Sequence, residues 1–178
     1  PTLKQRLARV ENLIGLENCG LDKISLQEGI LKIGAMATHD DVSNSKLIKS
    51  ENPAIAELAS QIGDRQVRNR GTIGGSLANN DPSACYPAAL LALAGKVHTN
   101  KRDIKAEDFF VDLFETALEE DEIITSVSLP KPEKAAYEKF PNPASRYALV
   151  GVFVAKFDSE IRVSVTGAGE EGVFRCLE

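Results

Sequence analysis

The C-terminal half of the chain constrains the fold most strongly, because short apolar runs follow one another there with no helix-length segment between them. In the last run Ile161, Val163 and Val165 alternate with polar residues, which is typical of a strand with one face in water. Consecutive strands with short connections favour antiparallel pairing, since a parallel pair needs a crossover of a dozen or more residues. Expected strands lie at residues 122–129, 147–157 and 161–165, with a shorter one near 137–140.

The first half of the chain carries helix signals. Thr38 and Asp41 form a capping-box arrangement, which predicts a helix running toward Lys49. Asn52-Pro53 opens a second helix with one apolar face. Further expected elements are a helix at 3–10, a strand at 30–36, a helix at 88–94, a strand at 96–99 and a helical turn at 106–110. The sequence therefore predicts an α+β fold, a mixed, mainly antiparallel sheet with helices packed on one side.

Composition fits one globular domain. The 178 residues are 43% hydrophobic and 26% charged, and the net charge of −5 argues against nucleic acid as a partner. No apolar stretch approaches the length of a membrane span, and the N-terminal residues lack a signal-peptide core. Cys19, Cys85 and Cys176 show no CxxC spacing, so we expect reduced thiols, no metal site and a cytoplasmic protein.

No constellation of a nucleophile and a base emerges from the sequence. His39 falls in the first turn of an expected helix and is interpreted as a polar surface residue rather than a catalytic base. His98, on an expected strand, is interpreted as a surface residue rather than a ligand. The acidic run is interpreted as a solvated surface; it comprises Glu115, Glu119, Glu120 and Glu122.

The glycine-rich segment around Thr72 is the strongest functional signal. Gly71, Gly74 and Gly75 give the backbone freedom to approach an anion, and Thr72 and Ser76 add hydroxyl donors. A helix expected soon afterwards would also suit a phosphate. The alternative is a tight turn between two packed elements. The spacing matches neither the Walker loop nor the Rossmann Gly-x-Gly-x-x-Gly.

The longer string RQVRNRGTIGGSLANNDPSACYPAALLAL, residues 65–93, closely resembles the second flavin-binding stretch of the FAD-binding medium subunits of molybdenum hydroxylases. That family includes aerobic carbon monoxide dehydrogenase and xanthine dehydrogenase-like enzymes. The similarity continues through ALEEDEIITSVSLP, YEKFPNPASRYALVGVFVAKF and VTGAGEEGVFR, and so covers residues 1–175. The resemblance implies an FAD-binding domain over residues 1–178, like the second subdomain of the vanillyl-alcohol-oxidase-type fold.

The resemblance also implies roles for particular residues. Backbone amides of the segment Thr72, Ile73, Gly74, Gly75 and Ser76 would hold the FAD pyrophosphate. Ile124 would lie against the flavin or its ribityl chain. Tyr147 would pack near the isoalloxazine ring, or else be a core tyrosine. The basic cluster Arg65, Arg68 and Arg70 would form salt bridges, contact an FAD phosphate, or lie in a solvated loop.

Several positions depart from the family pattern. Cys85 stands where relatives usually carry an acid that holds a ribityl hydroxyl, and a thiol is a poorer acceptor. Asp81 or Asn80 would compensate, or another contact would replace this one. Pro141 stands where relatives often carry a basic residue. Relatives also begin with an Ala-Gly-Gly-x-Ser loop and continue into a C-terminal domain, so we expect a chain shortened at both ends that binds FAD weakly or not at all.

The function implied by the resemblance is electron transfer. Electrons from a molybdopterin centre on a large subunit would pass through two 2Fe-2S clusters on a small subunit to FAD, and then to a quinone or another acceptor. Protein groups would position the cofactor rather than perform the chemistry. One alternative is a flavin-free remnant that acts only as an interaction domain in such a complex. Another is an independent module that binds a different dinucleotide, such as NAD.

Overall fold

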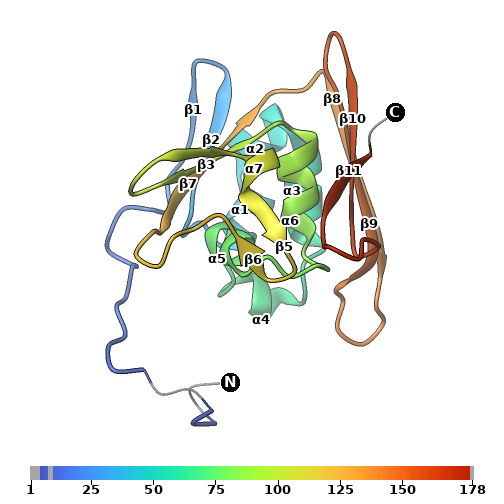
Figure 1. Ribbon diagram of the computed structural model, residues 1–178. Coiled ribbons are helices and arrows are strands. Elements are labelled where there is room, and N and C mark those ends of the chain that lie inside the picture. The colour runs from blue at the N-terminus through green and yellow to red at the C-terminus, as the bar shows by residue number, and fades with distance from the viewer. Residues whose placement is uncertain (1–4, 8–9, 177–178) are drawn as a thin grey trace.

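The computed structural model describes residues 5–7 and 10–176, and in it two antiparallel sheets enclose a layer of helices (Figure 1). The first sheet has the order β1 (Ile24–Gln27), β2 (Ile30–Gly34), β7 (Ile124–Pro130), β3 (Lys96–Thr99) and β4 (Asp103–Lys105). The second has the order β11 (Phe174–Cys176), β10 (Ile161–Thr166), β9 (Ala148–Lys156) and β8 (Lys134–Pro141). A small hairpin joins β5 (Phe110–Asp112) and β6 (Glu115–Thr116).

Seven helices are present in the described part of the chain. They are α1 (His39–Asn44), α2 (Lys46–Glu51), α3 (Pro53–Ser60), α4 (Arg65–Arg68), α5 (Ile73–Asn79), α6 (Cys85–Ala92) and α7 (Ala106–Phe109). The capping box predicted at Thr38 is confirmed, because its hydroxyl accepts from the Asp41 amide at 3.0 Å and the Asp41 carboxylate accepts from the Thr38 amide at 3.0 Å. The helix expected to run on from there is divided, since the Ser45 hydroxyl caps α2.

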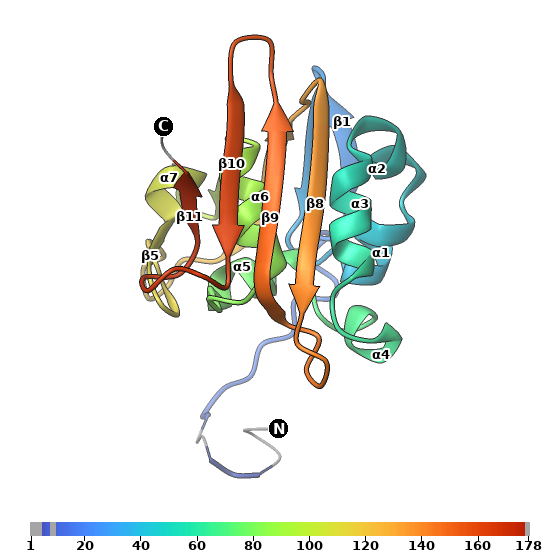
Figure 2. The same ribbon diagram turned by 90° about the vertical axis from the view of Figure 1, so that its right-hand side faces the viewer.

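The core lies between the two sheets and centres on α6. Every residue of α6 is buried, as expected for a helix covered on more than one side. It packs against β9 and β10, whereas α5 packs against β7 and α3 against β8. Figure 2 shows the second sheet in front of α5 and α6, with α3 beside β8 and the outer face of the sheet toward the viewer. No helix in the described ranges is long and apolar enough to cross a membrane.

The α+β class and the antiparallel pairing are confirmed, and β8, β9 and β10 form the predicted run of neighbouring strands. The arrangement differs in one respect, because β7 joins β2 and β3 in a separate sheet. The helices consequently face two sheets instead of covering one side of a single sheet. The helix predicted at 3–10 lies partly outside the described residues, and Gln5 and Arg6 form a turn.

The strand β10 reverses the predicted orientation of its two faces. Its polar residues Arg162, Ser164 and Thr166 are buried, whereas Ile161 is 65% exposed. Two of these polar side chains have partners between the layers. The Arg162 guanidinium donates to the Leu91 carbonyl at 3.0 Å and pairs with Glu107 at 2.6 Å, and the Thr166 hydroxyl donates to the Ala84 carbonyl at 2.7 Å. The Ser164 hydroxyl is buried with no partner among the described residues. The prediction of a wet polar face was therefore wrong. The outer face of the second sheet is apolar instead, and includes Phe140, Val152, Val154, Ile161, Val163 and Val165.

Candidate functional site

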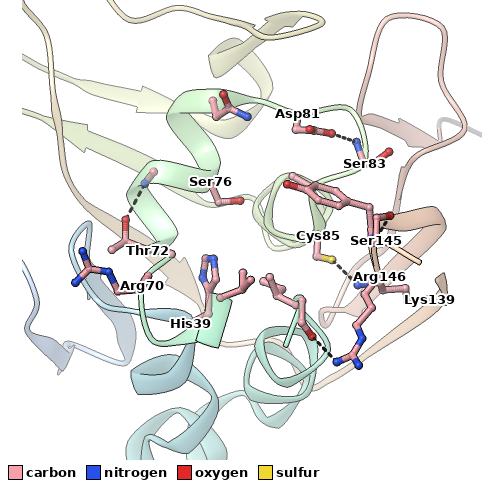
Figure 3. A pocket seen from close by; sticks show the side chains of 18 residues that line it. His39, Arg70, Thr72, Ser76, Asp81, Ser83, Cys85, Lys139, Ser145 and Arg146 are labelled. Carbon is pink, nitrogen blue, oxygen red and sulfur yellow. Dashed lines mark hydrogen bonds between the residues drawn. The ribbon is translucent and has the colours of Figure 1, made fainter. Parts of the chain in front are cut away.

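A cavity of about 540 Å³ opens where the start of α5, the start of α6 and the turn between β8 and β9 meet (Figure 3). It brings together six of the nine residues that the resemblance assigned to the cofactor: Thr72, Gly75, Ser76, Asp81, Cys85 and Tyr147. The remaining walls include His39, Arg70, Asn79, Ser83, Lys139 and Arg146. Segments more than 70 residues apart in the sequence therefore converge on one site.

The glycine-rich segment is the first turn of a helix rather than a loop or a turn between elements. Thr72 is the N-cap of α5, and its hydroxyl accepts from the Gly75 amide at 3.1 Å. The Ile73 and Gly74 amides donate to carbonyls of residues 37 and 35, and the Ser76 amide donates to the Thr72 carbonyl at 3.0 Å. Four of the five amides expected to hold a pyrophosphate are thus already used. The Thr72 amide has no acceptor among the described residues.

Three residues assigned by the resemblance do not line the cavity. Ile73 is 2% exposed and faces the core beneath α5. Gly74 lies directly on Ala35, where a built side chain would place its Cβ 2.6 Å from the Ala35 Cβ. Ile124 is buried in β7. Their contact with a cofactor stays a prediction, and their observed role is to hold α5 and the first sheet together.

Asp81 and Cys85 meet different partners at the cavity. One Asp81 carboxylate oxygen accepts from the Ser83 amide at 2.8 Å, and no other hydrogen bond to this carboxylate is found in the described ranges. The Cys85 sulfur lies 3.5 Å from the Lys139 ammonium, which also donates to the Gln61 carbonyl at 2.9 Å. A carboxylate with an open oxygen and an ammonium group therefore line the same cavity.

Sequence reasoning missed Lys139 and Arg146. Lys139 follows Tyr137 by two residues on β8, and Tyr137 is buried, so the two-residue period of a strand was a usable signal that Lys139 points inward. Arg146 had no such signal. It sits in the left-handed region with φ of 62°, in the turn before β9, and donates to the Gly63 carbonyl at 3.3 Å.

The basic cluster before α5 is divided by the fold. Arg70 lines the cavity, whereas Arg68 donates to the carbonyls of Ile62 and Gly63 at 3.2 and 3.3 Å. No ion pair of Arg65, Arg68 or Arg70 is found among the described residues. Tyr147 is 52% exposed at the cavity, so its interpretation as a core tyrosine was wrong.

His39 is a buried wall of the cavity, and its interpretation as a surface residue was wrong. It is 5% exposed, its backbone amide donates to the Gly71 carbonyl at 2.9 Å, and its ring lies 5.4 Å from the Tyr86 ring. Glycine is required at 71, because a Cβ there would lie 2.5 Å from the His39 Nε2. The Nδ1 atom is buried with no partner among the described residues.

Glu122 also departs from its expected place on a solvated surface. Its side chain is fully covered, and both carboxylate oxygens accept from the Arg102 guanidinium, at 3.1 and 3.0 Å. The Thr99 hydroxyl donates to the same carboxylate at 2.6 Å. The Arg102 hydrogen bonds, followed by that of Thr99, lower the pKa of Glu122 to about 2. These contacts of Glu122 fix the loop before β7 to the end of β3 at Thr99 and to the turn between β3 and β4 at Arg102.

Burial, and then the positive charge of Arg68, lowers the pKa of His39 from 6.5 to about 4. Between pH 6.5 and pH 4 the unfolded chain therefore binds a proton at His39 that the folded chain does not. The contribution of His39 to the free energy of unfolding is fully present above pH 6.5 and is lost as the pH falls toward 4. We expect the free energy of unfolding to drop by up to about 3 kcal/mol across this window. Urea unfolding at several pH values measures it. The control is His39→Gln, which keeps every carboxylate; an equal pH dependence in the variant would contradict the assignment.

Comparison with known proteins identifies relatives along nearly the whole chain. Residues 1–132 match the family model described as the FAD binding domain in molybdopterin dehydrogenase. The nicotine 6-hydroxylase medium subunit of Paenarthrobacter nicotinovorans is 36% identical, over 94% of this chain and 63% of its own length. The carbon monoxide dehydrogenase medium chain of Hydrogenophaga pseudoflava is 32% identical, over 98% of this chain and 66% of its own. The chain thus spans slightly less than two thirds of these relatives.

Solved structures agree with the sequence matches. Carbon monoxide dehydrogenase from Hydrogenophaga pseudoflava superposes with a TM-score of 0.88 at 32% identity, over 98% of this chain and 65% of that one. Quinoline 2-oxidoreductase from Pseudomonas putida 86 gives a TM-score of 0.89 at 28% identity, with the same coverage. The two-sheet architecture around the cavity is therefore shared with proteins of known structure.

Proposed function

Because the chain belongs to the family of FAD-binding domains of molybdopterin dehydrogenases, we propose that it is the flavin-binding part of a molybdenum hydroxylase medium subunit, similar to that of aerobic carbon monoxide dehydrogenase. The observation that carries this proposal is the cavity of about 540 Å³, whose lining includes most of the residues assigned to FAD. Its volume lies within the range of about 300–1,000 Å³ usual for cofactor sites. The described residues represent the second subdomain of the vanillyl-alcohol-oxidase-type fold.

The residues at the start of α5 fit the pyrophosphate of FAD. The Thr72 hydroxyl accepts from the Gly75 amide, which leaves its own O–H free to donate. Figure 3 shows the Ser76 hydroxyl directed toward the cavity and Arg70, which also lines the cavity, beside Thr72. A guanidinium and two hydroxyl groups suit phosphate oxygens. We propose that these groups and the Thr72 amide replace the row of backbone amides expected from the sequence.

The residues just before and at the start of α6, on β8 and just before β9 fit the ribityl and ribose hydroxyls and the isoalloxazine ring of the cofactor. The open oxygen of Asp81 can accept from a ribityl or ribose hydroxyl, which the Cys85 thiol does poorly. Lys139 supplies an ammonium, and Tyr147 offers an aromatic face at the cavity mouth.

We propose a molybdopterin large subunit and an iron–sulfur small subunit as partners, in the cytoplasm. Bound FAD would supply the electron-transfer chemistry between the iron–sulfur clusters and an external acceptor. The chain itself holds and orients the cofactor and limits its access to water. The relatives named as medium subunits or chains support this assembly. The apolar outer face of the second sheet also supports it, because large exposed apolar patches mark interaction surfaces.

Titration of the purified chain with FAD, followed by the change in flavin fluorescence, tests the proposal. We expect saturable binding below about 100 μM FAD, and a Lys139→Met variant should bind about tenfold more weakly, because a charged hydrogen-bond donor is lost. Lys134→Met is the matched control, since Lys134 is exposed on the same strand and does not line the cavity. Equal weakening in both variants would contradict the assignment of this cavity.

Two other functions predict different results in the same titration. A flavin-free interaction domain would show no saturation with FAD, yet would still assemble with the large and small subunits. A module for another dinucleotide would bind NAD in preference to FAD, and added FAD would not displace the bound NAD. Competition between the two cofactors in one sample separates these cases.

A further inference from the structure

The outer face of the first sheet carries a hydrogen-bonded series of Ser128, His98 and Asp103. The Ser128 Oγ lies 2.8 Å from the His98 Nε2, and the His98 Nδ1 lies 2.6 Å from an Asp103 carboxylate oxygen. The three residues come from β7, β3 and β4, which are adjacent strands. They share no lining residue with the flavin cavity, so the proposed cofactor site does not explain them.

These contacts match those of an activated serine. In the tautomer of His98 that carries its proton on Nδ1, this N–H donates to the Asp103 carboxylate. The Nε2 atom is then an acceptor, and the Ser128 hydroxyl donates to it. A nucleophile and base within about 2.6–3.2 Å, with the base held by a third group, are the geometric signature of nucleophilic catalysis. The His98 side chain is 21% exposed, and Asp103 is exposed and orients the ring.

Two lysines flank the hydroxyl on the neighbouring strands. Ser128 pairs directly with Lys32 of β2 on one side and with Lys96 of β3 on the other. Residues directly opposite each other in an antiparallel sheet project from the same face, with Cβ atoms about 4.5–5.5 Å apart. Two ammonium groups beside the serine can stabilise the negative oxygen that forms when it attacks a carbonyl.

A surface hollow of about 600 Å³ gives a ligand access to this set. Its lining includes Ser128, His98 and both lysines, together with the apolar residues Ile30, Ala94 and Pro130. The apolar part can receive the acyl chain of a small ester, and the lysines can receive its carbonyl oxygen. A nucleophile, a base, an electrophilic pair and a binding surface are thus present in one hollow.

We propose that Ser128 is the nucleophile of a second, hydrolytic site that cleaves carboxylic esters of small acids. The Ser128 Oγ bonds to the carbonyl carbon while its proton passes to the His98 Nε2, and the ester C–O bond breaks as the alcohol leaves with that proton. Water then attacks the acyl-serine, gives one proton to His98, and releases the carboxylic acid as Ser128 regains its proton. The net reaction consumes one ester and one water, without an oxidant or reductant.

A fluorophosphonate probe tests the nucleophile on the full chain. We expect one phosphonyl group per chain by intact mass, located on Ser128 by peptide mapping, and none on Ser128→Ala. Ser126→Ala is the matched control, because Ser126 lies on the same strand and face, opposite His98, and donates no hydrogen bond to it. Thermal unfolding of each variant verifies folding. Labelling at another residue, or equal labelling of Ser128→Ala, would overturn the proposal.

Hydrolysis of p-nitrophenyl acetate tests the roles of the other two residues. His98→Ala should slow release of p-nitrophenol about a hundredfold, as expected for loss of a general base. Asp103 is a positioning residue, so Asp103→Asn should slow it about tenfold and Asp103→Glu should recover part of the loss. Equal rates in the unmodified chain and in His98→Ala would mean that the hydrogen-bonded series only stabilises the sheet.

Discussion

A Phe153→Ala variant is expected to lose about 3–5 kcal/mol of the free energy of unfolding, the range usual for a fully buried phenylalanine. Phe153 is 0% exposed in β9, the strand that both β8 and β10 pair with. Its ring lies 6.2 Å from that of Tyr137, and β9 packs on α6. Truncation therefore removes apolar burial and leaves a void between the second sheet and the helical layer. Urea unfolding monitored by circular dichroism measures the change.

Phe140→Ala provides the matched control for this prediction. Phe140 lies on the adjacent strand β8 but is 68% exposed. Substitutions at such surface positions usually change stability by less than about 0.5 kcal/mol. A loss in Phe140→Ala as large as that in Phe153→Ala would show that the outer face of the sheet, and not the layer between the sheets, carries the packing energy.

The loss at Phe153 also has a consequence for the cavity. Domains of ordinary size have about 5–15 kcal/mol of stability in total, so for a domain near the lower end of this range a loss of about 3–5 kcal/mol unfolds a measurable fraction of molecules. The second sheet supplies Lys139 from β8, and Tyr147 directly precedes β9. We therefore expect FAD binding by Phe153→Ala to weaken together with its stability, although Phe153 does not line the cavity.

The parts of the fold that could be predicted are those that depend on residues close together in the sequence. The strands around residues 137–165 could be predicted, because short connections and alternating apolar residues specify neighbouring antiparallel strands. The membership of β7 in the other sheet could not, because its pairing with β2 joins residues almost 100 positions apart. The alternation along β10 identified two faces, but the buried face is the polar one, and there the Leu91 carbonyl and the Glu107 carboxylate, both far away in the sequence, accept from the Arg162 guanidinium.

In the two candidate sites, too, the features that could not be predicted depend on residues far apart in the sequence. The capping box predicted the helix start beside His39, yet Gly71 and Tyr86 bury the imidazole, and both lie more than 30 residues away. The glycine-rich segment could be singled out from its glycine spacing and from a resemblance, and part of it lines the cavity, whereas Arg146 reaches the same cavity only because the turn before β9 folds back. The hydrogen-bonded series at Ser128 has no sequence motif, since sheet register alone assembles it.

A Gly74→Ala variant is expected to lose about 2–3 kcal/mol of stability, the upper part of the range of about 1–3 kcal/mol that overpacking typically costs, because the Ala35 backbone cannot yield. The new Cβ would lie 2.6 Å from the Ala35 Cβ and 2.8 Å from the Ala35 carbonyl oxygen, which accepts from the Gly74 amide at 2.9 Å. Relief requires α5 to move away from the end of β2. That movement would displace Thr72 and Ser76, so FAD binding should weaken as well.

Gly75→Ala separates this packing effect from the general cost of altering a glycine-rich helix start. A Cβ at residue 75 meets only the Thr72 Oγ1, at 3.1 Å, and Gly75 has no positive φ to preserve. Alanine favours a helix over glycine by roughly 0.5–1 kcal/mol, which offsets a small adjustment of the cap. We therefore expect stability within about 1 kcal/mol of the unmodified chain in urea unfolding without FAD. Similar losses in both variants would mean that the cap at Thr72, rather than the contact with Ala35, anchors α5.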